Sequence, residues 1–283
     1  MTAQPPTDRD AWPVMDATAF RAVVRKWITA NWSTGITVRE WWRRLADAGL
    51  TVPTWSSALG GISATTSIQQ VIEDELGRIV TVAPPLGGVG VHLVGPVLRQ
   101  FGAGLQRDRH LRSIVDGTSN WCLLIDEPDG LDDAGSVASL GTRDGAGWAI
   151  DAVKMSTDAD LADRGLLLVR TTPGSTGRDG LSCFLLALDQ PTISVQRLSS
   201  GSSVVVCHGA TADAHDLVGD AGNGWQVAQT VFAHQQTSLA GRIRRGLVDV
   251  PSGEKAGNLE RTTGDVLTRT LPRRMTGIER RRS

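Results

Sequence analysis

A short acidic stretch at residues 126–133 carries the densest group of side chains that could do chemistry. It opens with Asp126, Glu127 and Pro128, and four of its eight residues are aspartates. Carboxylates at this density can hold calcium when they follow the ligand spacing of a calcium loop. Pro128 and the missing spacing argue against such a loop. We therefore expect a solvated loop and no metal site.

A second candidate group is the run His234, Gln235 and Gln236. Histidine can exchange a proton near neutral pH, whereas a glutamine amide cannot accept one. Neighbours on a helix point about 100° apart, so His234 could not easily act in place of Gln235. We expect His234 to be structural or exposed.

Other familiar catalytic patterns are missing from the sequence. It contains no GxSxG, Walker or HExxH motif, and Gly88, Gly90 and Gly95 do not form a GxGxxG motif. Cys207 and His208 with His215 do not show the spacing of a metal site. The three cysteines are widely spaced and odd in number, which indicates buried thiols in a reducing compartment.

The charge is distributed unevenly, although the formal net charge is only -1. Residues 240–283 contain eleven Lys or Arg against five acids, so this segment is +6 and the remainder is -7. The arginines lack interleaved aromatic residues, so a solvated helix face and tail are expected, and nucleic acid is not. The sequence shows no apolar N-terminal leader and no apolar run that spans a bilayer, which favours a cytoplasmic protein without membrane contact.

The first zone, residues 1–117, is predicted to be helical. Phe20 begins an i, i+3, i+4 pattern that continues to Ile28, and Thr37 with Glu40 forms the sequence of a capping box. Apolar residues predict a third helix over 68–79. A fourth is expected between residues 90 and 102, where Pro96 would kink or interrupt it. Residues 49–61 have the composition of a loop.

The middle zone, residues 118–219, changes to short apolar runs separated by Gly, Ser, Pro and Asp. Because no helix is predicted between these runs, they indicate an antiparallel sheet or barrel. The expected strands are 148–153, 166–171, 181–188, 193–198 and 204–207.

The last zone, residues 220–283, returns to helix after Gly224 and is expected to hold a second helix over 255–270, ended by Pro272. The predicted class is α+β, with an N-terminal helical domain, a central antiparallel β domain and a partial C-terminal helical domain with a basic tail.

Several short sequence motifs, in the order in which they occur along the chain, resemble those of the acyl-CoA dehydrogenases. Each is weak alone, but their order and the zones in which they fall match that family. The motifs include Glu127-Pro128, Ala134-Gly135-Ser136, Lys154, Ala162-Asp163 and Gly224-Trp225-Gln226-Val227-Ala228. The resemblance implies FAD-dependent α,β-dehydrogenation of an acyl-CoA thioester in lipid or steroid degradation. In that reaction a carboxylate removes the α-proton and a hydride passes to the flavin.

The resemblance also assigns residues to the flavin and the substrate. The flavin-facing residues would be Leu124, Ile125 and Asp126 in one stretch, and Ser156 and Thr157 in another. Ser136 and Arg242 would contact the substrate. Two departures put flavin occupancy in question. Asp126 stands where the family usually has a hydroxyl donor, and the family's flavin-packing Trp after Lys154 is replaced by Ser156 or deleted.

The family's catalytic Glu lies either late in the last domain or early in it. Gln235 aligns with the early position, and the chain is expected to end before the late one, as a C-terminally shortened member with no catalytic residue of its own. Three readings follow: a flavoprotein subunit that needs a second acyl-CoA dehydrogenase-like chain, a catalytically dead remnant or structural partner, or an independent dehydrogenase with an unrecognised base. The first implies acyl-CoA as ligand and a homo- or hetero-oligomer.

Overall fold

A computed structural model describes residues 9, 12–78, 88–128, 136–157 and 159–244, with side chains as far as residue 236. The chain divides into two compact units, Met1–Phe232 and Ala233–Ser283. The domain boundaries predicted near residues 117 and 219 remain predictions.

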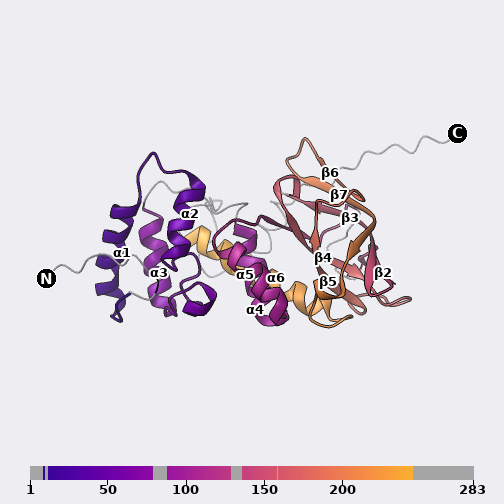
Figure 1. Cartoon of the computed structure of the whole chain (residues 1–283), viewed down its shortest axis with the longest axis horizontal. Coiled ribbons are helices and arrows are strands. Elements are labelled where there is room, and N and C mark those ends of the chain that lie inside the picture. Colours follow the sequence, from indigo (N-terminus) through magenta and orange to yellow (C-terminus); the bar gives the residue numbers. More distant parts are fainter. Residues whose placement is uncertain (1–8, 10–11, 79–87, 129–135, 158, 245–283) are drawn as a thin grey trace, which may run out of the picture. The chain divides into compact units, whose positions relative to one another are not determined.

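Three capped helices open the fold. They are α1 (Ala17–Asn31), α2 (Val38–Asp47) and α3 (Thr66–Leu76). Each begins after a side chain that accepts a backbone N–H of the first turn, and these caps are Asp16, Thr37 and Thr65. Figure 1 shows α1 and α3 side by side, and both bury an apolar stripe.

The capping box predicted at α2 is only half formed. Thr37 accepts the N–H of Glu40 at 3.2 Å, as expected. The Glu40 carboxylate accepts hydrogen bonds from Arg43 and Arg44 on its own helix. Two guanidinium groups within one turn are stronger partners for a carboxylate than a backbone amide is.

The fourth predicted helix is not interrupted at Pro96. A π-helical turn at Gly90–Val94 leads directly into α4 (Gly95–Phe101), so the change of helix type comes one residue before the proline. A further helix, α5 (Gly104–Val115), was not predicted individually. Single 3-10 turns lie at Ser57–Leu59, Ala159–Leu161 and Ala214–Asp216.

Among the described residues, eight strands form one sheet in the order β6-β7-β3-β2-β4-β5-β8, and β1 also pairs with β4. Their bounds are β1 Trp121–Leu124, β2 Leu140–Asp144, β3 Gly147–Ser156, β4 Arg164–Arg170, β5 Leu181–Ala187, β6 Ile193–Arg197, β7 Ser203–Ala212 and β8 Leu217–Val218. Five pairings are antiparallel, but β1 and β2 each pair with β4 in parallel. The sheet is therefore mixed, because the β2–β3 hairpin separates β1 from β4 along the chain.

The hydrophobic core lies on both faces of β4 and β5. On β4, Leu166 and Leu168 belong to the cluster that includes the helices, whereas Leu167 and Val169 belong to the cluster inside the β part. Burial on both faces explains why these two strands are continuous apolar runs in the sequence. The predicted α+β class is confirmed. The helix α6 (Gly224–Arg244) begins as expected, and the helix predicted over 255–270 lies outside the described residues.

Candidate functional site

The structure brings together the two stretches that were assigned to the flavin. The chain leaves β1 at Leu124, and the N–H of Met155 on β3 donates to the carbonyl oxygen of Asp126 at 2.8 Å. Ser156 is the last residue of β3, and Thr157 follows it directly. Segments about thirty positions apart in the sequence therefore meet through a backbone hydrogen bond.

These residues differ in what they expose. The side chains of Leu124 and Ile125 are buried in the two hydrophobic clusters, so only their main chain could face a ligand. Asp126 and Thr157 are exposed, and Ser156 is half-buried. Residues 124–126 and 156–157 together form the candidate flavin edge. The polar side chains on it are one carboxylate, Asp126, and two hydroxyls, Ser156 and Thr157.

Lys154 anchors the edge from inside the protein. Its ammonium nitrogen lies 2.8 Å from Oε1 of Glu127 and 3.3 Å from the carbonyl oxygen of Ile125. The lysine side chain is fully buried, and the Glu127 side chain is 12% exposed. A buried ammonium is costly unless a counter-charge and hydrogen bonds compensate it, and Glu127 with Ile125 provides both.

Glu127 joins a third segment to the pair. Its two carboxylate oxygens accept the backbone N–H groups of Ala138 and Ser139 at 2.9 and 3.1 Å. The segment just before β2 is thus fixed to the chain that leaves β1. One carboxylate and one ammonium connect β1, β2 and β3 at the place where the candidate flavin residues lie.

The pair stabilises its own charges. Burial alone would raise the pKa of Glu127, but the charge of Lys154 and the hydrogen bonds from Lys154, Ser139 and Ala138 hold it below its ordinary value. Burial lowers the pKa of Lys154, and Glu127 opposes that shift. Since each group favours the charged form of the other, we expect an ionised pair at neutral pH.

Asp126 adds a second negative charge. Desolvation by the surrounding protein raises the pKa of its carboxyl, and the Lys154 charge acts in the opposite direction. The side chain is nevertheless exposed to solvent. Because water still reaches the carboxylate, we expect Asp126 to be ionised at neutral pH.

The donor set fits a flavin in part. The polar edge of a flavin ring offers several acceptors and one N–H donor. The hydroxyls of Ser156 and Thr157 can donate to such acceptors, whereas an ionised Asp126 can only accept from the N–H. Ser136, predicted to contact substrate, is exposed and lies two residues before Ala138. The neighbouring acidic run, 129–135, lies outside the described residues.

The remaining predicted residues lie on α6. Gln235 and His234 are both half-buried. Burial lowers the pKa of His234 below its ordinary value. A neutral imidazole and an amide are both uncharged, so this turn of α6 brings no carboxylate. Arg242 falls within the helix, but its side chain is outside the described part.

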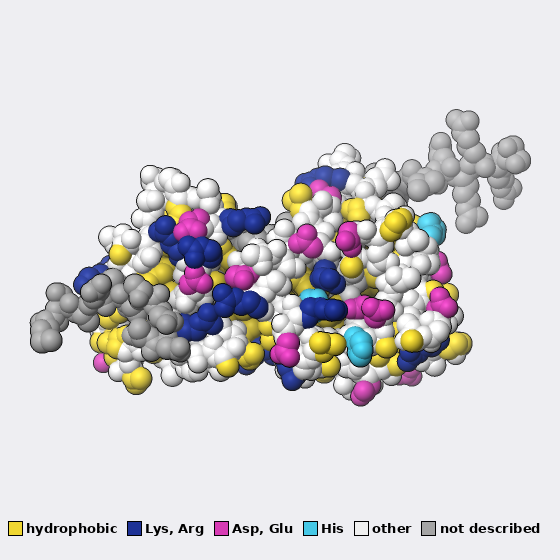
Figure 2. All heavy atoms as spheres, viewed as in Figure 1, with side chains coloured by type: hydrophobic (Ala, Val, Ile, Leu, Met, Phe, Trp, Pro, Cys, Tyr) yellow, Lys and Arg dark blue, Asp and Glu magenta, His cyan; other side chains and the backbone are white. Residues whose placement is uncertain are grey.

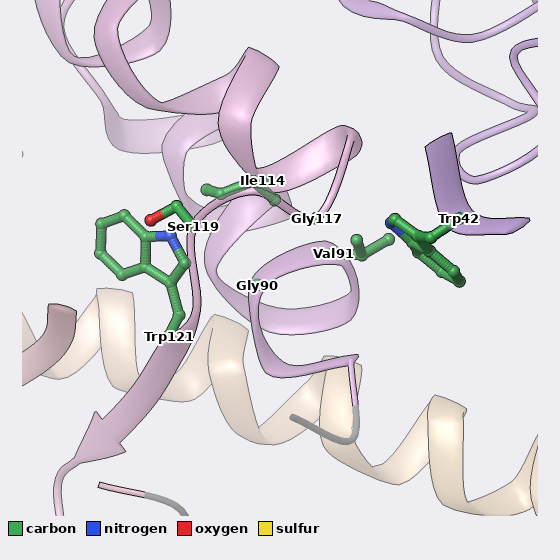
Figure 3. Close-up of a pocket in the computed structure, with 7 residues that line it drawn as sticks. All are labelled: Trp42, Gly90, Val91, Ile114, Gly117, Ser119 and Trp121. Carbon is green, nitrogen blue, oxygen red and sulfur yellow. The ribbon is translucent and has the colours of Figure 1, made fainter. Parts of the chain in front are cut away.

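A small cavity is lined by residues other than the candidate flavin residues. Trp42, Gly90, Val91, Ile114, Gly117, Ser119 and Trp121 line it (Figure 3). Its volume of about 10 Å³ is on the scale of a single water. Trp121 is 1% exposed, and its indole N–H has no hydrogen-bond partner within the described structure. None of the predicted site residues lines this cavity.

The sequence identified Glu127 and Lys154 as parts of motifs that resemble the family's, but it did not predict that these two residues form an ion pair. One signal could have revealed it. Every second residue of β3 is buried, beginning with Trp148, Ile150 and Ala152. Lys154 is the next residue in this series, so its side chain is on the same inward face of the strand. A lysine on the inward face of a strand requires a buried counter-charge.

Two other site classes find no support in the part of the chain that the structure describes. Within those residues, no group of three or more His, Cys, Asp or Glu side chains is arranged to hold a metal ion. Among the helices described, none is both long and apolar enough to cross a membrane.

Comparison with known proteins identifies the family. Residues 16–118 match the model of the acyl-CoA dehydrogenase N-terminal domain. Over 246 residues the chain is 31% identical to acyl-CoA dehydrogenase IpdE1 of Mycobacterium tuberculosis, which covers 79% of this chain and 64% of that protein. The chain thus spans somewhat less than two thirds of that relative.

Solved structures show the same fold. One is named "Tcur3481-Tcur3483 steroid ACAD G363A variant" and has a TM-score of 0.68 at 25% identity, covering 81% of this chain and 65% of that one. An acyl-CoA dehydrogenase from Geobacillus kaustophilus has a TM-score of 0.67 at 18% identity, with 92% and 78% covered. The ChsE4-ChsE5 complex from Mycobacterium tuberculosis has a TM-score of 0.65 at 18% identity, with 92% and 75% covered. Residues 16–118 thus match the N-terminal domain of the acyl-CoA dehydrogenase family, and the fold of the described residues is similar to that of these acyl-CoA dehydrogenase structures.

Proposed function

We propose that this chain is a flavoprotein subunit of an acyl-CoA dehydrogenase that acts on acyl-CoA thioesters in lipid or steroid degradation, together with a second chain of the same family. The observation that carries the proposal is the meeting of the Asp126 stretch with the end of β3. Two relatives with this fold are named as paired chains, Tcur3481-Tcur3483 and ChsE4-ChsE5, and the first is named a steroid enzyme.

A bound flavin would supply the hydride acceptor for the β-carbon. The residues of this chain would hold and orient it: Ser156 and Thr157 through their hydroxyls, and residues 125–127 through the main chain. The α-proton needs a carboxylate near neutral pH. Gln235 cannot take that proton. We therefore assign the base to another carboxylate, supplied by the partner chain.

A second function is favoured by Asp126 and Gln235 together. One places a negative charge where a flavin would accumulate electrons, and the other is an amide at the family's early base position. Both features fit a structural subunit that shapes its partner's site and has no oxidoreductase activity itself.

Co-expression with a homologous acyl-CoA dehydrogenase chain separates these functions. The purified complex should reduce an electron-accepting dye when given acyl-CoA, and the partner's carboxylate should be essential. Under the proposal, Ser156→Ala with Thr157→Ala lowers turnover or flavin content of the complex. If that double variant leaves both unchanged while the complex stays intact, the structural role is correct.

A further inference from the structure

The Lys154–Glu127 ion pair occupies an unusual place for a buried charge pair. Most of its hydrogen bonds hold main chain: Lys154 binds the carbonyl of Ile125, and Glu127 binds the N–H groups of Ala138 and Ser139. The next residue along β3, Met155, bonds to Asp126. The pair thus fixes the backbone on both sides of Asp126.

Stability alone is a poor explanation for such a pair. Desolvation cancels much of the attraction between buried charges, and apolar residues of similar size often stabilise a protein as well or better. What an ion pair with four hydrogen bonds does provide is a single arrangement of the groups it binds. Here those groups belong to the chain leaving β1, the chain entering β2, and β3.

The charges also matter to the adjoining carboxylate. With Lys154 present, Asp126, Glu127 and the ammonium sum to one negative charge. Without Lys154, two carboxylates would adjoin one another on consecutive residues, and repulsion would displace the Asp126 stretch or protonate one acid. Lys154 therefore allows Asp126 to stay ionised beside Glu127.

We propose that Lys154 and Glu127 are positioning residues of the flavin site: their ion pair aligns residues 125–127 with the end of β3 so that the two flavin-facing stretches form one edge. This inference rests on the proposed function for the identity of the ligand. The alignment itself is a property of the protein without ligand, so it can be tested separately.

The test compares Lys154→Met, Glu127→Gln and the double variant with the wild type, alone and with the partner chain. Glu75→Gln is the matched control, because Glu75 is a buried carboxylate on α3 that binds Arg21 and Arg25 in the helical part. It should lower the melting temperature without reaching the candidate flavin edge. FAD titration and the visible absorption bands of bound flavin are one readout. Amide hydrogen exchange of the ligand-free chain is the other.

Each single variant is expected to weaken FAD binding roughly tenfold or more and to shift the absorption bands, because the charge beside the ring changes. The double variant should lose less than the sum of the singles, since the two residues act as one unit. In the ligand-free chain, the amides of Ala138, Ser139 and Met155 should exchange faster than in Glu75→Gln.

The outcomes separate the two claims. If no wild-type preparation binds FAD, the proposed function fails, and the exchange data still decide whether the pair aligns the two stretches. If the wild type binds FAD but the single variants bind it as Glu75→Gln does, the positioning role is wrong. Exchange at Ala138, Ser139 and Met155 that matches the control would equally overturn it.

Discussion

The side-chain amide nitrogen of Gln106 lies 2.8 Å from the carbonyl oxygen of Leu217, 111 positions later in the chain. The same nitrogen donates to the carbonyl of His215 at 2.7 Å, and the amide oxygen accepts the N–H of Ala103 at 2.9 Å. Gln106 is 3% exposed. The hydrogen bonds of this one side chain therefore connect α5 to the segment that leads into β8, and β8 pairs with the core strand β5.

Gln106→Leu should destabilise the protein by roughly 1–3 kcal/mol, because it leaves two carbonyl oxygens and an N–H, all in part-buried hydrogen bonds, without their partner. Urea unfolding would measure the loss as a lower midpoint with unchanged slope. Gln69→Leu is the control, since Gln69 makes one i,i+4 hydrogen bond with Glu73 on α3 and should cost about 0.5 kcal/mol or less. Equal effects of the two substitutions would refute the connecting role of Gln106.

His110 should make stability depend on pH between about 4 and 6.5. It is buried on α5 against Trp121, and burial, with the charges of Arg164 and Arg109, lowers its pKa to about 4. As pH falls below 6.5, the unfolded chain takes up the proton first, so stability is lost until the folded pKa is reached. The full loss would be roughly 3 kcal/mol.

A His110→Gln variant isolates this contribution. Its unfolding free energy should fall less than that of the wild type between pH 6.5 and 4, measured by urea titration at each pH. The arginine-bound carboxylates Glu40 and Glu75, whose pKa values are lowered to about 2, contribute mainly below pH 4.5. Parallel pH profiles for variant and wild type would contradict the assignment.

Gly61 should not tolerate even a methyl group. A Cβ there would overlap the carbonyl oxygens of Trp55 and Val52, which belong to backbone and cannot rotate away. Gly61→Ala is expected to cost roughly 3 kcal/mol or to prevent folding. Gly104→Ala at the start of α5 meets nothing within 4 Å and should stabilise by about 0.5–1 kcal/mol. Melting temperatures that move in the same direction would disprove this contrast.

Asp126→Ser should raise the reduction potential of bound flavin. A carboxylate beside the ring opposes the negative charge of the reduced form, so its removal favours reduction, and about 1.4 kcal/mol would correspond to about 30 mV. Spectroelectrochemical titration of the complex gives the value. Asp144→Ser on exposed β2 is the control. A potential that falls, or that moves as much in the control, would count against the placement of Asp126.

Local patterns predicted much of the fold. The Thr37 cap of α2 and five strands followed from side-chain chemistry within a few residues. The parallel pairing of β1 with β4 did not, because it joins positions such as Leu123 and Leu166 that no local pattern relates. The helix α5 was missed because four of its twelve residues are charged and the polar residues Gln106 and His110 occupy part of its buried face.

The candidate site residues came from the family resemblance, and their roles remain predictions. Asp126, Ser156 and Thr157 were named, and the structure brings their two stretches together. The ion pair that joins these stretches was missed, since Lys154 and Glu127 are 27 positions apart and the inward position of Lys154 does not reveal which residue carries its counter-charge. Exposed ion pairs also occur, as between Arg43 and Asp47, and Figure 2 shows basic and acidic side chains close together on one face.

The most direct test of the account is the FAD content of this chain purified with its candidate partner, read from flavin absorbance after release from the protein. The account predicts stoichiometric FAD in the complex and a clear loss of it in the Ser156→Ala, Thr157→Ala double variant. A complex that is intact and holds its full FAD with both hydroxyls removed, or one that never holds FAD, would contradict it.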